Sequence, residues 1–236
     1  MKRVSLLLAC LLTLALLLAP TAGGQEPGVK QTEEWKSSFS VDRKNLGPTG
    51  TNPYFILEPG FKLYYQHGKD TLTTTVLAQT KMIDGVETRV VQDREMKNGQ
   101  LAELTLDYYA IDRSTGDVYY FGEDVDTYKN GKVVDHKGAW LSGVKGAKFG
   151  LMMPGQIKVG LKFYQEQAPG VGMDRAELVA VGEKVVTPAG TFENCIHFKE
   201  TSALEKGVAD HKWYAPGVGM VKEAEFVLVK IEKPGR

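Results

Sequence analysis

Three side chains near the C-terminal end of the chain are of the types that acid–base chemistry or metal binding requires. His197 and Glu200 fall in one strand-like run, and His211 falls in the next. Imidazole nitrogens and carboxylate oxygens bind transition metals and also transfer protons, so these residues are candidates for either role if the two runs pair. The four histidines of the chain include no closely spaced pair of the kind found in common zinc motifs. The site therefore depends on the register of the strands.

The densest acidic cluster offers a second kind of site. Glu123, Asp124 and Asp126 stand close together ahead of a predicted turn. Calcium prefers several oxygen ligands from one short segment, so a Ca²⁺ site is conceivable here. The spacing matches no EF-hand, and the alternative is an acidic hairpin whose carboxylates are simply solvated.

Signatures of covalent catalysis and of phosphate binding are missing from the sequence. There is no G-x-S-x-G nucleophile elbow. The Pro-Gly-Val-Gly stretches at 169–172 and 216–219 precede strand-like runs rather than helices, so they are turns and not phosphate-binding loops. We predict no catalytic residue, and the residues favour a non-catalytic protein.

The elements that would position these side chains repeat with a period of two. Alternating, β-branched runs are separated by Asp84-Gly85, Asn98-Gly99 and Asn130-Gly131, which are strong hairpin signals. Later runs include 191–201, 210–214 and a continuous strand over 220–231. The pattern predicts an all-β fold of one domain with little helix: a curved antiparallel meander, half-barrel or barrel-like, of about 10–12 strands.

A glycine-rich segment at 138–160 interrupts this rhythm and is unusually apolar. Such a segment typically folds over the end of a sheet, where it either closes the core or covers a cavity. With the strand that ends in Trp213-Tyr214, it supplies the residues that we predict to contact a ligand: Trp140, Phe149, Met152, Met153, Trp213 and Tyr214.

The first 24 residues have the layout of an export signal. Lys2 and Arg3 precede an apolar run at 4–19, and small residues follow it. We therefore predict a signal peptide at 1–24, a flexible segment at 25–52 and a single β-domain at 53–236, in a protein exported to the periplasm or beyond the cell. Two alternatives remain: a lipoprotein anchored through Cys10, because Leu7-Leu8-Ala9-Cys10 resembles a lipobox, or a retained membrane anchor.

Charge and cysteine content narrow the range of partners. The full chain balances 29 basic against 29 acidic side chains, and loss of Lys2 and Arg3 leaves a small acidic excess. That balance gives no electrostatic basis for binding nucleic acid. Cys195 would be the single cysteine after cleavage, so no internal disulfide can form and the core must stabilise the fold. Apart from the calcium or transition-metal sites considered above, we predict no cofactor.

Five motifs stand out along the chain, at 52–55 with 59–60, 119–124, 138–154, 187–192 and 211–219. Together they resemble a family of secreted, functionally uncharacterised bacterial proteins. The resemblance covers nearly all of the predicted domain, and its ending Tyr-Ala-Pro-Gly-Val-Gly is also similar to a theme of TapB-like and LolA/LolB-like envelope proteins. That similarity implies a curved antiparallel sheet able to hold apolar ligands, and no catalytic residues are established for the family.

These observations favour an exported envelope or extracellular protein whose curved sheet binds a lipid or another apolar molecule. One alternative is a structural or adhesive surface module that contacts other envelope proteins, which predicts an exposed aromatic patch and a filled core. The other is a secreted hydrolase or metal-dependent enzyme built on the two histidines and Glu200, which requires those side chains to converge.

Overall fold

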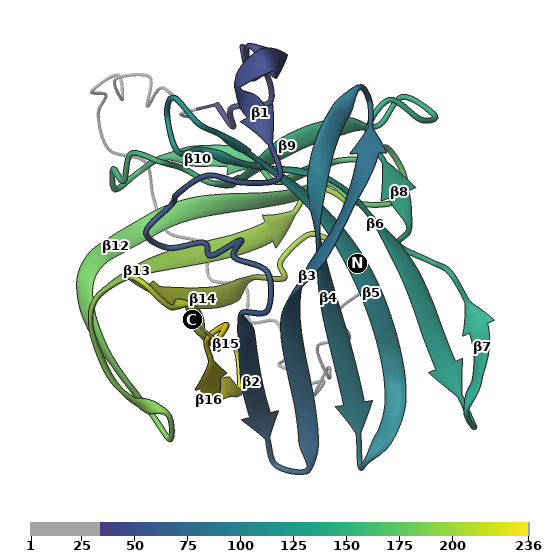
Figure 1. The fold of residues 1–236 in the computed structure, drawn as a ribbon, viewed down its shortest axis with the longest axis vertical. Helices are drawn as coiled ribbons and strands as arrows, with labels where there is room; N and C mark the ends of the chain where they lie inside the picture. The colour runs from purple at the N-terminus through teal and green to yellow at the C-terminus, as the bar shows by residue number, and fades with distance from the viewer. Residues whose placement is uncertain (1–33, 236) are drawn as a thin grey trace, which may run out of the picture.

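The computed structural model describes residues 34–235, and the expected signal segment with Cys10 lies outside them. The described chain is all-β, as predicted, with one short 3-10 helix (Figure 1). Its elements are η1 (Arg43–Asn45), β1 (Leu46–Gly47), β2 (Lys62–His67), β3 (Asp70–Ile83), β4 (Val86–Lys97), β5 (Gln100–Asp112), β6 (Val118–Lys129), β7 (Lys132–Asp135), β8 (Trp140–Leu141), β9 (Lys148–Met153), β10 (Lys162–Tyr164), β11 (Glu166–Gln167), β12 (Asp174–Thr187), β13 (Gly190–Ser202), β14 (Asp210–Ala215), β15 (Gly219–Glu223) and β16 (Phe226–Glu232).

One continuous antiparallel path forms the wall of a nearly closed barrel. It runs β10-β12-β13-β14-β15-β16-β2-β3-β4-β5-β6-β9-β11. Gln165 alone separates β10 from β11, yet β10 pairs with β12 at one end of the path and β11 pairs with β9 at the other. The segment 162–167 therefore brings the two ends of the sheet together.

The predicted hairpin turns are confirmed by their backbone angles. Asp84 and Gly85 have φ of 49° and 74°, and Asn98 and Gly99 have φ of 50° and 78°. Two successive residues with positive φ are what a tight type I′ turn requires, because its twist matches that of the flanking strands. These turns give the long hairpins β3–β4 and β4–β5 in the front wall of Figure 1.

The predicted continuous strand over 220–231 is wrong. The chain reverses at Ala224, whose φ is 46°, so that β15 and β16 pair with each other through Lys222↔Val227 and Glu223↔Phe226. Ala224 and Glu225 are exposed, and neither carries a strong turn signal. A short turn made by ordinary residues is difficult to recognise in an alternating run.

Two parts of the glycine-rich segment belong to the sheet. Both β8 and β9 pair with β6, and Trp140 and Met153 are buried. Its glycines permit close packing of backbones: a Cβ on Gly150 would lie 2.4 Å from the carbonyl oxygen of Gln165. This part of the chain therefore closes the core.

The segment predicted to be flexible over 25–52 is ordered against the barrel from residue 34 onward. Leu46 and Gly47 form β1 and pair with β5, and both are buried. The Arg175 guanidinium lies 4.6 Å from the ring centre of Trp35. The apolar side chains scattered through this polar stretch thus pack against the rest of the domain, and Leu46 belongs to its core.

Alternation along β14 places its residues on two opposite surfaces. Lys212 and Tyr214 face the interior, where both line a cavity. His211 and Trp213 therefore face outward, because successive side chains of a strand point to opposite faces. The two surfaces carry the two candidate sites.

Candidate functional site

A cavity of about 80 Å³ lies inside the barrel. Its walls come from β2, β3, β4, β5, β9, β14, β15 and the segment before β2. Most of the lining is apolar, and it includes two predicted ligand contacts, Met152 and Tyr214. The lining residues are Phe55, Ile56, Phe61, Leu63, Tyr65, Thr74, Val76, Val91, Asp93, Asp107, Tyr109, Met152, Lys212, Tyr214, Val218, Gly219 and Met220.

A buried charge network borders this cavity. The ammonium of Lys212 lies 2.6 Å from Glu200 Oε2 and 3.2 Å from Glu223 Oε1. The Lys212 side chain is only 8% exposed, so it needs these carboxylates to offset the loss of hydration. Asp93, also in the lining, accepts a hydrogen bond of 2.6 Å from the Thr74 hydroxyl.

A second carboxylate of the lining, Asp107, is held by a buried tyrosine. The Tyr120 hydroxyl donates to Asp107 Oδ1 at 2.5 Å. Burial raises the pKa of Tyr120 well above its usual value, and the charges of Asp107 and Glu123 act in the same direction. Tyr120 therefore remains a neutral donor that orients the carboxylate.

Stacked aromatic rings connect the cavity to β8. Phe55 meets Tyr109 edge-on with ring centres 4.9 Å apart, and Tyr109 stacks on Tyr120 at the same separation. Trp140 packs edge-on against Tyr120 at 5.4 Å. Trp140 therefore supports the wall of the cavity from behind and does not line it.

One side of the cavity is bounded by two segments that lie outside the long strands. Phe55 and Ile56, both half-buried, come from the stretch that crosses the barrel before β2, and Val218 comes from the β14–β15 turn. The backbone N–H of Gly217 donates to the carbonyl oxygen of Pro53 at 2.7 Å, which fastens the two segments together. Both segments are thus part of the cavity wall.

The other predicted ligand contacts are distributed elsewhere. Phe149 stacks on Phe121 with ring centres 4.9 Å apart, and Met153 is fully buried in the core. Trp213 lies on the outer face of the sheet. The structure thus brings Met152 and Tyr214 to the cavity and leaves Trp140, Phe149, Met153 and Trp213 outside its lining.

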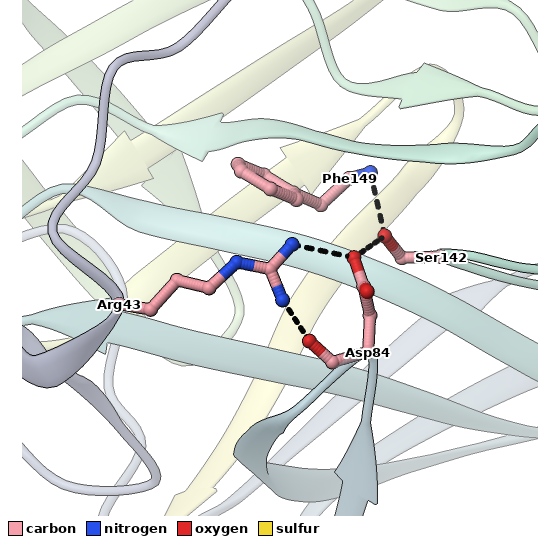
Figure 2. A network of polar contacts seen from close by, with 4 residues as sticks. All are labelled: Arg43, Asp84, Ser142 and Phe149. Atoms are coloured by element: carbon pink, nitrogen blue, oxygen red, sulfur yellow. Dashed lines mark hydrogen bonds and ion pairs between the residues drawn. The ribbon is translucent and has the colours of Figure 1, made fainter.

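Beyond the cavity, a polar network fixes the N-terminal half of the glycine-rich segment (Figure 2). Asp84 Oδ2 accepts hydrogen bonds from Arg43 Nη2 at 2.8 Å and from the Ser142 hydroxyl at 3.1 Å. Ser142 Oγ in turn accepts from the N–H of Phe149 at 3.1 Å, and Arg43 also donates to the Asp84 carbonyl oxygen. One carboxylate at a hairpin tip therefore connects η1 to the segment that leads into β9.

Strand alternation separates the residues of the predicted calcium site. Glu123 is buried opposite Asp107, whereas Asp124 points outward to Lys81 Nζ at 2.8 Å. Asp126 lies 2.9 Å from His136 Nδ1. The three carboxylates therefore do not converge on one point. Among residues 34–235, no group of three or more histidine, cysteine, aspartate or glutamate side chains is arranged to hold a metal ion.

The predicted histidine pair does form, but without Glu200. His197 Nε2 lies 2.7 Å from His211 Nδ1 on the outer face, while Glu200 bonds Lys212 on the inner one. Glu183, which the sequence analysis did not single out, takes the place of Glu200 at 3.5 Å from His197 Nδ1. Burial lowers the pKa of His197, against the opposing effect of Glu183.

Sequence reasoning also missed the charged residues around the cavity. Asp93, Asp107 and Lys212 each occupy an inward position in an alternating strand and line the cavity. The available signal was strand alternation, because residues two positions apart in a strand face the same side. Lys212 is two positions from Tyr214, and Asp107 is two positions from Tyr109.

The chain can be compared with family models, with curated proteins and with solved structures. No family model and no curated protein matches the chain. The chain is similar to a crystal structure named "putative lipoprotein" from Parabacteroides distasonis, with 12% identity, a TM-score of 0.40, and coverage of 78% of this chain and 100% of that one. In the described part of the chain, no helix is long and apolar enough to cross a membrane.

Proposed function

We propose that this protein is an exported binding protein that holds an apolar or amphiphilic small molecule inside its β-barrel. The observation that carries the proposal is the interior cavity, whose lining is mainly apolar with a few polar side chains. Binding sites for small molecules typically combine these two features, because apolar contact supplies affinity and a few polar groups fix orientation.

The size of the cavity limits its occupant. A volume of about 80 Å³ is well below the roughly 300–1,000 Å³ of pockets for drug-sized ligands. At this size the cavity suits a short apolar group, such as the end of an acyl chain. A larger ligand requires Phe55 and Ile56 to swing away from the cavity.

The polar groups indicate where the head of an amphiphile would lie. Asp93, Asp107 and Lys212 all reach the lining, so a ligand with hydrogen-bonding groups at one end would place that end beside them. The apolar remainder would contact Leu63, Val76 and their neighbours. Export is part of the proposal and is supported by the leader-like pattern of residues 1–24.

The two alternative functions find less support. A surface module predicts an exposed aromatic patch, but the large hydrophobic side chains exposed within residues 34–235 are valine, leucine and methionine. A hydrolase built on His197, His211 and Glu200 requires three convergent side chains, and Glu200 lies on the opposite face from the two histidines.

Native mass spectrometry of the protein purified from its own host tests the proposal directly. A co-purifying apolar or amphiphilic molecule is the expected result. The proposal fails if the protein is ligand-free and also does not bind fluorescent fatty acids in solution.

A matched pair of variants locates the binding. Ala-Pro-Gly-Val-Gly occurs at 168–172 and at 215–219, but Val218 lines the cavity whereas Val171 is 42% exposed. We expect Val218→Trp to fill the space and reduce probe affinity at least tenfold, while Val171→Trp leaves it unchanged. Equal effects of the two changes would place the binding somewhere else.

A further inference from the structure

The outer face of the sheet carries a cluster of rings that is independent of the cavity. In the pairing of β13 with β14, His197 lies opposite Trp213 and Lys199 lies opposite His211. His211 is thus two positions along β14 from the residue that faces His197. His197 and His211 are therefore diagonal neighbours on one face, on the side opposite Lys212 and Tyr214. Their ring centres are 4.9 Å apart.

Two imidazole nitrogens point at each other within this cluster. His197 Nε2 and His211 Nδ1 are 2.7 Å apart, a separation that suits a shared proton when no ion is present. The same two nitrogens are the atoms with which neutral histidines bind metals. A metal ion placed about 2.0–2.1 Å from each nitrogen would require the rings to separate by only a fraction of an ångström.

Besides His211, the ring of His197 contacts Glu183 and Trp213. Glu183 Oε1 lies 3.5 Å from His197 Nδ1, and Glu183 Oε2 accepts a hydrogen bond of 2.5 Å from Trp213 Nε1. Trp213 stacks on the imidazole with ring centres 4.2 Å apart. A carboxylate on Nδ1 keeps the proton there and leaves Nε2 as a lone pair, as is usual for metal-binding histidines.

We infer that His197 Nε2 and His211 Nδ1 form a two-histidine site for a divalent transition-metal ion, Cu²⁺ or Zn²⁺, on the outer face of the barrel. Imidazole suits both ions, and the order of metal affinities favours Cu²⁺. Glu183 acts as a positioning residue, because it faces the opposite edge of the His197 ring from Nε2 and cannot reach the same ion.

The remaining coordination positions are open to water or to a donor from another molecule. Lys199 lies opposite His211 in the sheet, and Lys222 Nζ is 4.8 Å from the ring centre of Trp213. Their positive charge disfavours a bare cation and favours a co-ligand that carries negative charge, such as a carboxylate. The site is thus suited to an exchangeable ion and not to a closed structural one.

Titration of the intact protein with CuCl₂ and with ZnCl₂ tests this inference. Trp213 provides the signal, because an ion beside His197 lies close to the stacked indole and Cu²⁺ quenches its fluorescence. We expect binding of one ion, with nitrogen hyperfine structure from two imidazoles in the Cu²⁺ electron paramagnetic resonance spectrum. Calcium, a hard cation that prefers oxygen ligands, is expected to have no effect.

Variants separate this site from others on the chain. His211→Ala is expected to weaken binding at least tenfold and to remove one nitrogen from the spectrum, and Glu183→Gln to weaken it about 10–100-fold with both nitrogens retained. His136→Ala is the control, since His136 pairs with Asp126 elsewhere on the barrel. Thermal unfolding confirms that each variant is folded. An unchanged affinity in His211→Ala and in a folded His197→Gln variant would overturn the inference, as would an equal loss in His136→Ala.

Discussion

Asp84 and Ser142 lie far apart in the sequence and share a hydrogen bond of 3.1 Å between the serine hydroxyl and Oδ2 of the carboxylate. The same oxygen accepts a hydrogen bond from Arg43. The Asp84 side chain, at the tip of the β3–β4 hairpin, therefore links its own hairpin to the segments that contain Arg43 and Ser142. The Arg43 guanidinium holds the pKa of Asp84 below its usual range against the opposing effect of burial, and the Ser142 hydroxyl adds a smaller lowering effect.

Asp84→Asn should destabilise the protein by about 1–2 kcal/mol at neutral pH, because two hydrogen bonds to a charged acceptor are weakened. Asparagine also accepts positive φ before glycine, so the turn itself should persist. Since the native pKa is lowered, the stabilising effect is complete above the unfolded pKa near 3.8 and is lost as the pH falls through the native value. The difference in free energy of unfolding between the wild-type protein and Asp84→Asn, measured with urea, should therefore vanish in acid. Asn130→Asp, the reverse exchange at a similar turn, is the control and should change stability by less than about 0.5 kcal/mol.

Gly150→Ala should cost about 1–3 kcal/mol of stability or more, because the new methyl group would lie 2.4 Å from the Gln165 carbonyl oxygen and 2.6 Å from that of Tyr164. Neither contact is with a flexible side chain, so β9 or the 162–167 segment must shift. The matched change Gly235→Ala meets nothing within 4 Å and should be neutral. Thermal unfolding of the two variants measures the difference, and equal midpoints would contradict the close approach.

Lys212→Met should destabilise the protein by about 3–5 kcal/mol, because it leaves Glu200 and Glu223 buried without their shared cation. Lys230→Met provides the comparison. Lys230 lies 2.5 Å from Glu232, but its side chain is 58% exposed, and removal of such a solvent-screened surface pair should leave the stability nearly unchanged. Chemical denaturation with urea gives both values. A cost below 1 kcal/mol for Lys212→Met would show that the interior network contributes little to folding.

The parts of the fold that the sequence could predict are those set by local chemistry. Asp84-Gly85 and Asn98-Gly99 determine tight turns almost independently of their surroundings, and the alternating runs beside them determine strands. The Ala224 turn was missed because its residues carry no such signal. The pairing of β10 and β11 with opposite ends of the sheet depends on contacts between strands far apart in the chain, which periodicity does not encode.

The candidate sites show the same contrast between local signals, which the sequence carries, and contacts between distant strands, which it does not. The approach of His197 to His211 was predicted because neighbouring strands commonly pair. Glu200 was the wrong third member, since a spacing of three in a strand puts it on the face opposite His197. Glu183 comes from β12, and its position beside His197 results from bulges in the pairing of β12 with β13. No pattern in the sequence predicts these bulges.

The six-residue segment 162–167 has a consequence for the behaviour of the molecule in solution. While it is in place, it pairs with residues 175–177 of β12 at one edge of the sheet and with residues 148–149 of β9 at the other. If it detaches, β12 and β9 both become edge strands with an unpaired side, and each could pair with a strand from a second molecule. We therefore expect any association of this protein through its sheet to depend on whether this short stretch of chain stays in place.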